Sequence, residues 1–66
     1  MQSWNLKTFV DNNGINAAAR VWDKSRQAVE QALIKDRDIQ IVKLDGFYEV
    51  HEYKLLNKIA IDEVSL

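Results

Sequence analysis

Five side chains with strong hydrogen-bonding groups fall within the seven-residue segment 25–31. They are Ser25, Arg26, Gln27, Glu30 and Gln31. Each of these residue types can contact the edge of a nucleic-acid base, since glutamine pairs with adenine, arginine with guanine, glutamate with cytosine and serine with several bases. The segment could therefore distinguish base pairs if all five side chains pointed to one exposed surface.

A helix over residues 26–35 would give these side chains a common surface. Three apolar residues have the spacing of a buried helical stripe, namely Val29, Ala32 and Leu33. With this stripe inward, the outward residues are Gln27, Glu30, Gln31 and Ile34, and the exposed N-terminus carries Ser25 and Arg26. Any soluble protein surface has a similar pattern, so two interpretations stay open: a base-reading helix and a plain surface helix.

The residues before the helix 26–35 predict a second helix that packs against it, and the two together would form a helix-turn-helix. Its inward residues have the same spacing and are Ala18, Val21 and Trp22. The run of small residues at 17–19 would let the two helices cross closely. Asp23 can adopt the left-handed conformation that ends a helix, and Ser25 is a favourable N-cap for the next one.

A further helix is expected at the start of the chain. Asn5 is its N-cap, and Trp4 can pack on Phe9 as a hydrophobic staple. Gly14 is expected to take the positive φ that closes the helix. The sequence thus predicts three short helices before residue 36.

Two expectations concern residues at the borders of these helices. Residues 1–3 carry no pattern and are expected to be loose. Asn16 is expected to cap the second helix, where its side chain and the nearby amides could hold a phosphate. Asn16 is therefore a second candidate DNA contact.

The pattern changes to strands after residue 38. Segments 39–44 and 47–54 are rich in β-branched and aromatic residues and are separated by Asp45-Gly46, which favours a type I′ hairpin turn. Pairing across this turn would place Ile41 opposite Val50 on the core face. The outer edge of segment 47–54 is expected to pair with a second copy of the chain, since an unpaired edge is an aggregation hazard.

The tail of the chain, residues 55–66, has no glycine or proline and keeps an apolar composition that is not typical of disorder. Residues 59–61 could form another strand, or their side chains could cover a partner. The sequence does not distinguish these two possibilities.

Length and composition limit the classes of protein that remain. The chain has 66 residues and no cysteine, and its one histidine, His51, is expected on the surface. A single domain over 1–66 follows, near the lower size limit for folding without crosslinks, so self-association would add stability. Without a thiol or a second imidazole we expect no enzymatic activity, no metal site and no cofactor.

The distribution of charge favours the helical part as the surface for nucleic acid. The formal net charge is −1, but residues 1–43 carry seven basic residues against five acids, and the remainder carries two against five. No apolar run approaches the roughly 20 residues of a membrane span. The N-terminus also lacks the apolar core of a signal peptide, so we expect a cytoplasmic protein without a membrane partner.

The whole layout resembles the Cro repressors of lambdoid bacteriophages, and within them the lambda-type proteins with mixed helices and strands. The residues that carry the resemblance lie between about 5 and 56 and include Leu6-Lys7, Phe9, Gly14, Ala19, Ser25-Arg26-Gln27-Ala28-Val29, Ala32-Leu33, Arg37, Ile39 and Asp45-Gly46. Some Cro relatives replace the hairpin with helices, but the strand composition of residues 39–54 favours an α+β fold. The expected architecture is three short helices containing a helix-turn-helix, followed by a C-terminal antiparallel β-hairpin.

The resemblance implies a homodimeric transcriptional repressor in the bacterial host cytoplasm, with the helix 26–35 in the major groove of pseudo-palindromic operator half-sites. It implies DNA contacts by Asn16, Ser25, Arg26, Gln27, Glu30, Gln31 and Arg37. It also implies a dimer interface that includes Tyr53, Leu55 and Leu56. No small-molecule substrate is implied.

This sequence departs from the family pattern at several positions. Asp23 replaces the usual turn glycine, Glu30 puts a negative charge on the expected DNA surface, and the tail is apolar and acidic rather than basic. Fewer cations displace fewer counterions, so we expect weak nonspecific DNA binding. The alternative interpretation is a protein-interaction module of the same fold that does not bind DNA, favoured by Glu30, outward Ile34 and the net charge.

Overall fold

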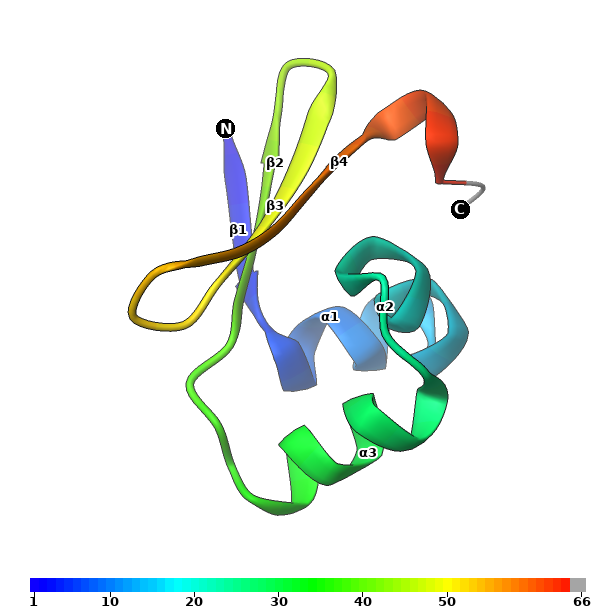
Figure 1. The fold of residues 1–66 in the computed structure, drawn as a ribbon, viewed down its shortest axis with the longest axis vertical. Helices are drawn as coiled ribbons and strands as arrows, with labels where there is room; N and C mark the ends of the chain where they lie inside the picture. Colours follow the sequence, from blue (N-terminus) through cyan, green and yellow to red (C-terminus); the bar gives the residue numbers. More distant parts are fainter. Residues whose placement is uncertain (65–66) are drawn as a thin grey trace.

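The computed structural model describes residues 1–64 and has an α+β fold, as predicted. In chain order the elements are β1 (Gln2–Asn5), α1 (Leu6–Asn13), α2 (Ile15–Trp22), α3 (Arg26–Ile34), β2 (Gln40–Leu44), β3 (Phe47–His51), β4 (Leu55–Ala60) and the short 3₁₀ helix η1 (Ile61–Glu63). The strands form one antiparallel sheet in the order β1-β2-β3-β4, and the helices lie together on one side of it (Figure 1). The predicted hairpin is thus the centre of a four-stranded sheet.

The N-terminal residues form a strand, so the expectation that residues 1–3 are loose is wrong. β1 pairs with the outer edge of β2, with Ser3 opposite Val42 and Asn5 opposite Gln40. The Leu6 N–H then donates to the Ile39 carbonyl over 2.9 Å. The strand is specified by the open edge of β2 rather than by its own polar sequence, which explains why the local pattern missed it.

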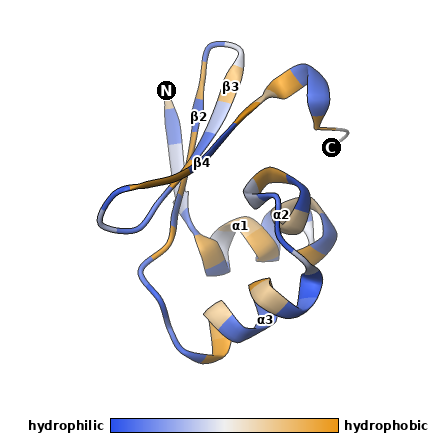
Figure 2. Ribbon diagram, in the orientation of Figure 1, coloured by the Kyte–Doolittle hydropathy of each residue, from blue (hydrophilic) through white to orange (hydrophobic). Residues whose placement is uncertain are grey.

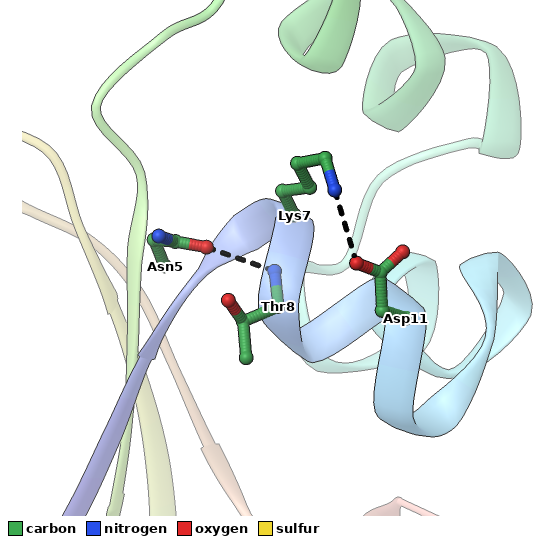
Figure 3. Close-up of polar contacts among 4 residues, drawn as sticks. All are labelled: Asn5, Lys7, Thr8 and Asp11. Atoms are coloured by element: carbon green, nitrogen blue, oxygen red, sulfur yellow. Dashed lines mark hydrogen bonds and ion pairs between the residues drawn. The ribbon is translucent and has the colours of Figure 1, made fainter.

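The start of α1 matches the prediction. The Asn5 side chain accepts a hydrogen bond of 2.8 Å from the Thr8 N–H (Figure 3). The rings of Trp4 and Phe9 meet edge to face with centroids 5.5 Å apart, which is the predicted staple. Phe9 is only 1% exposed, so this contact anchors α1 to the core beneath the sheet.

One residue, Gly14, connects α1 to α2. It has a φ of 90°, as predicted, and its N–H donates to the Val10 carbonyl over 2.7 Å. Gly14 also occupies the N-cap position of α2, so the expectation that Asn16 caps this helix is wrong. Because a single residue separates the helices, Asn16 already lies in the first turn of α2.

The corner between α2 and α3 is a Schellman motif with aspartate at the left-handed position. Asp23 has φ 59° and donates its N–H to the Arg20 carbonyl, and the Lys24 N–H reaches the Ala19 carbonyl over 3.0 Å. Ser25 then caps α3, since its hydroxyl oxygen accepts from the Ala28 N–H over 3.1 Å. Both predicted features of this corner are confirmed.

The C-terminal end of α3 repeats the same motif. Asp36 has φ 52° and donates to the Leu33 carbonyl, and the Arg37 N–H donates to the Ala32 carbonyl over 3.0 Å. The helix ends at Ile34, one residue before the predicted end. The two hydrogen bonds fix the backbone of Arg37 directly beyond the last turn of α3.

The central hairpin has the predicted register, with Leu44 opposite Phe47 and Ile41 opposite Val50. Its turn is not type I′, which needs positive φ at both central residues. Gly46 has φ 81°, whereas Asp45 is not among the residues with positive φ. That combination matches a type II turn, in which only the second central residue is left-handed.

β3 is shorter than predicted and has no free edge. It ends at His51, and β4 folds back to pair with it, with Tyr48 opposite Ile59 and an irregularity at Val50/His51. The prediction that the edge of residues 47–54 pairs with a second copy is therefore wrong, because β2 and β4 occupy both sides of β3. The outer strands of the sheet are β1 and β4.

The helices and one face of the sheet enclose a single apolar core. Its most buried larger side chains are Phe9, Val21, Val29, Ile39, Ile41 and Val50. β4 is tied to the helices by the Asn57 side-chain amide, which donates to the Val21 carbonyl over 3.0 Å. Figure 2 shows that α3 alternates between hydrophobic and hydrophilic residues. Across residues 1–64, no helix has the length and apolar character needed to cross a membrane.

Candidate nucleic-acid interface

The outer face of α3 has the orientation that the sequence predicts. Val29 and Ala32 are 0% and 1% exposed on the inner face, and Leu33 is half-buried beside them. The five candidate side chains are all exposed, namely Ser25, Arg26, Gln27, Glu30 and Gln31. Ile34 is 75% exposed, also as predicted. The structure therefore gathers these polar side chains on one accessible helix surface.

The side chains on this face are only lightly held by the protein. The nearest oxygen of Glu30 lies 3.9 Å from a terminal nitrogen of Arg26, and both side chains are at least half exposed. Such a pair contributes little to stability and leaves both groups free to move. Within residues 1–64, neither Gln27 nor Gln31 makes a side-chain hydrogen bond, so both amides are available to a ligand.

The surroundings of α3 carry no excess of positive charge. Segment 23–36 contains three basic residues, Lys24, Arg26 and Lys35, against three acids, Asp23, Glu30 and Asp36. Phosphate attraction from this face is correspondingly small, because affinity for the DNA backbone grows with the number of cations. The face is suited to directional hydrogen bonding more than to general attraction.

Asn16 is exposed in the first turn of α2, although it does not cap that helix. Its side chain makes no hydrogen bond within the described part of the chain and can still contact a ligand. The neighbouring Ala17 and Ala18 are buried and serve the packing of α2. Asn16 is thus the polar group that the start of α2 offers to solvent beside them.

Arg37 differs from the other candidates because the protein itself binds its guanidinium. Nε and one terminal nitrogen donate to the two carboxylate oxygens of Glu52, over 3.1 and 2.8 Å. The guanidinium carbon lies 5.4 Å from the centre of the Trp22 ring. The hydrogen bond holds the pKa of the Glu52 carboxyl below its usual value and raises the pKa of Arg37. Both groups therefore remain charged at neutral pH.

Sequence reasoning missed Glu52. It is 15 residues from Arg37, and it reaches the arginine only because the chain turns back at the end of β3. The connection between α3 and β2 and the turn between β3 and β4 lie on the same side of the molecule (Figure 1). No local pattern in the sequence identifies such a pair.

A groove of about 530 Å³ lies between α1 and the C-terminal end of α3. Apolar side chains that include Leu6, Val10 and Leu33 form part of its lining. On α1 its rim includes Lys7 and Asp11, which form an exposed ion pair of 3.1 Å (Figure 3). The groove belongs to the opposite end of α3 from Ser25 and Arg26.

The expected dimer residues lie at the end of the sheet. Tyr53 and Leu55 are 82% and 49% exposed, whereas Leu56 is half-buried against the core of its own chain. His51, half-buried, lies 2.9 Å from a Glu49 oxygen. Residues 1–64 contain no cluster of His, Cys, Asp and Glu that could hold a metal ion.

Comparison with known proteins gives one match. The family model described as Cro matches residues 1–58 of the chain, which include all three helices and most of the sheet. No curated protein and no solved structure matches the chain.

Proposed function

The chain belongs to the Cro family of DNA-binding transcriptional repressors of bacteriophages, and from that premise we propose that it reads a pseudo-palindromic operator by placing α3 in the major groove of each half-site. The observation that carries this proposal is the exposed row of hydrogen-bonding side chains on α3, in which Gln27 and Gln31 make no side-chain hydrogen bond within residues 1–64, above an inner face anchored by buried Val29 and Ala32. The family membership argues against the alternative of an interaction module that does not bind DNA.

Each residue of the interface has a role that follows from its chemistry. Arg26 and Gln27 at the start of α3 contact guanine and adenine, and Gln31 one turn later contacts a further base. Glu30 accepts from cytosine and rejects bases that present an acceptor at that place. The N-terminal amides of α3, together with Ser25, bind a backbone phosphate.

Two further residues complete the proposed contact surface. Asn16 donates its side-chain amide to a phosphate on the same half-site, since phosphate contacts fix the register of a protein on DNA. Arg37 contacts a base beyond the end of the recognition helix. Together these residues would allow one protomer to contact one half-site.

Specific reading requires two protomers, because one short helix contacts too few base pairs. We place the dimer interface at β4, an outer strand whose free edge can pair with β4 of a second copy. Exposed Tyr53 and Leu55 flank this edge, and Leu56 lies beside them. Twofold symmetry would then set half-sites about 34 Å apart. The proposed domain, residues 1–66, carries both recognition and dimerisation.

Selection from a random duplex pool tests this proposal. Sequences recovered by the full chain should contain two related half-sites, and a footprint on the recovered duplex should protect both, one helical turn apart. The variant Lys7→Ala is the matched control, since it removes an exposed cation from α1 and should select the same sequence. Recovery of unrelated sequences, with binding that depends only on salt, would refute operator reading.

Sedimentation of the protein alone tests the interface. Leu55→Asp places a charge on the proposed β4 contact and should shift the chain to a monomer without unfolding it. Gln2→Asp, at an exposed position of the other outer strand β1, is the control and should leave the dimer intact. A monomeric parent chain would contradict the dimer.

A further inference from the structure

Arg37 is restrained at both ends of its side chain, unlike Arg26. Its backbone N–H is bound to the Ala32 carbonyl at the end of α3, and its guanidinium makes two hydrogen bonds to Glu52. Glu52 is itself fixed in the turn after β3, where its N–H donates to the Lys54 carbonyl over 3.0 Å. Arg37 therefore links the end of α3 to the turn between β3 and β4.

The contacts leave one edge of the guanidinium open. An arginine has five N–H donors, and Glu52 occupies Nε and one terminal nitrogen while the Trp22 ring lies 5.4 Å from the guanidinium carbon. The side chain is still 39% exposed, and within residues 1–64 its second terminal nitrogen donates to no protein group. A planar fork held in this way loses little conformational entropy when it binds a second bidentate partner.

From these contacts we propose that Glu52 and Trp22 are positioning residues, which aim the free edge of Arg37 at a single base pair. Guanine is the base that this edge fits, because its O6 and N7 accept two parallel hydrogen bonds. The inference rests on the proposed function, in which Arg37 is one of several DNA contacts, and it adds the two groups that fix its direction.

The ion pair also changes what Arg37 contributes to binding. A free arginine attracts phosphate on any DNA, whereas an arginine neutralised by Glu52 adds little to counterion release. Arg37 thus contributes to discrimination between sequences more than to general affinity. This agrees with the equal numbers of basic and acidic residues around α3.

Glu52→Gln tests the proposal in the full chain. The amide keeps the shape of the side chain but cannot accept two hydrogen bonds from the guanidinium. On a duplex selected by the parent, discrimination at one base pair should fall about tenfold, while random duplex should bind with a salt dependence steeper by about one counterion.

Glu49→Gln is the matched control. Glu49 lies on β3, three residues before Glu52, and contacts His51 rather than Arg37, so this variant removes the same charge at a nearby position. It should retain the parent's discrimination at every base pair. Equal loss in both variants, or none in Glu52→Gln, overturns the positioning role alone, whereas a parent that binds all sequences equally overturns the proposed function as well.

The parent chain supplies an independent measurement that needs no variant. The Nε–H resonance of Arg37 should show the shift and slow exchange of a carboxylate-bound proton, and both should persist after the selected duplex is added. Loss of this signature on binding would mean that DNA displaces Glu52, and would overturn the proposal.

Discussion

The two ends of α3 present their arginines in opposite ways. At the N-terminal end, Arg26 is 62% exposed and its nearest acid, Glu30, is 3.9 Å away. Beyond the C-terminal end, Arg37 is fixed by its backbone, by Glu52 and by Trp22. Arginines on one surface can therefore differ in function: an exposed, mobile guanidinium adapts to its ligand, whereas one held by neighbouring groups selects its ligand by direction.

Trp22 packs in the core and lies against Arg37, so its removal should have the largest effect on the molecule. It is 3% exposed at the end of α2 and lies under Arg37. Trp22→Ala should lower the free energy of unfolding by about 3 to 5 kcal/mol, a large share of the stability of a chain this size. Thermal unfolding followed by circular dichroism measures this. Trp22→Phe, which retains a ring, should lose much less, and equal losses would contradict the packing role.

Substitutions at the N-terminal end of α3 should change DNA recognition without changing the fold. Arg26→Ala and Gln27→Ala should each lose about 1 to 3 kcal/mol of discrimination at one base pair of a selected duplex, because each removes a bidentate contact. Competition binding against single-base variants of the duplex measures it. Lys35 is an exposed cation at the other end of α3, and Lys35→Ala should weaken binding to all DNA sequences equally. A uniform loss with Arg26→Ala would instead mark it as a phosphate contact.

The turns before and after α3 should respond to substitution in the same way, although the arginines near them differ. Asp23 and Asp36 both have positive φ in Schellman motifs. Asp23→Gly and Asp36→Gly should each raise the free energy of unfolding by up to about 1 kcal/mol, since glycine relieves the left-handed strain. Asp45→Gly, at negative φ, should instead lower it. Denaturant unfolding distinguishes these signs, and stabilisation by Asp45→Gly would refute the argument.

Acid should break the ion pair between Arg37 and Glu52, and this should change the stability less than the substitutions above. The pKa of Glu52 is lowered by the hydrogen bond from Arg37, so the pair stabilises the fold above the usual carboxyl pKa of 4.5. That stabilisation is lost as the pH falls through the lower pKa of the folded protein. The difference in unfolding free energy between the parent and Glu52→Gln should therefore shrink as the pH is lowered. A difference that stays the same at every pH would contradict this contribution of the ion pair.

The sequence predicts those features whose causes lie within a few residues. The caps at Asn5 and Ser25, the left-handed Asp23 and the outward face of α3 all follow from contiguous patterns, and all are confirmed. The register of the central hairpin is likewise set by a two-residue turn. These features determine most of the helical part of the candidate site.

The features that were missed depend on partners far along the chain. β1 forms on the edge of β2, nearly 40 residues away, and β4 removes the free edge that β3 was expected to have. Glu52 contacts Arg37 only because the chain turns back at the end of β3. The prediction of a cap at Asn16 fails because the sequence does not reveal that Gly14 both ends α1 and caps α2.

The pairing of Asn5 with Gln40 brings the beginning and the end of the helical segment to adjacent positions on neighbouring strands. The three helices are thus an insert between two strands of one sheet, closed at its base by main-chain hydrogen bonds. An insert of another length would have to leave and rejoin the sheet at that pair and still cover the apolar face of the sheet. The sheet therefore acts as a frame that closes around the helical segment, with the strand pairing at Asn5 and Gln40 as its boundary.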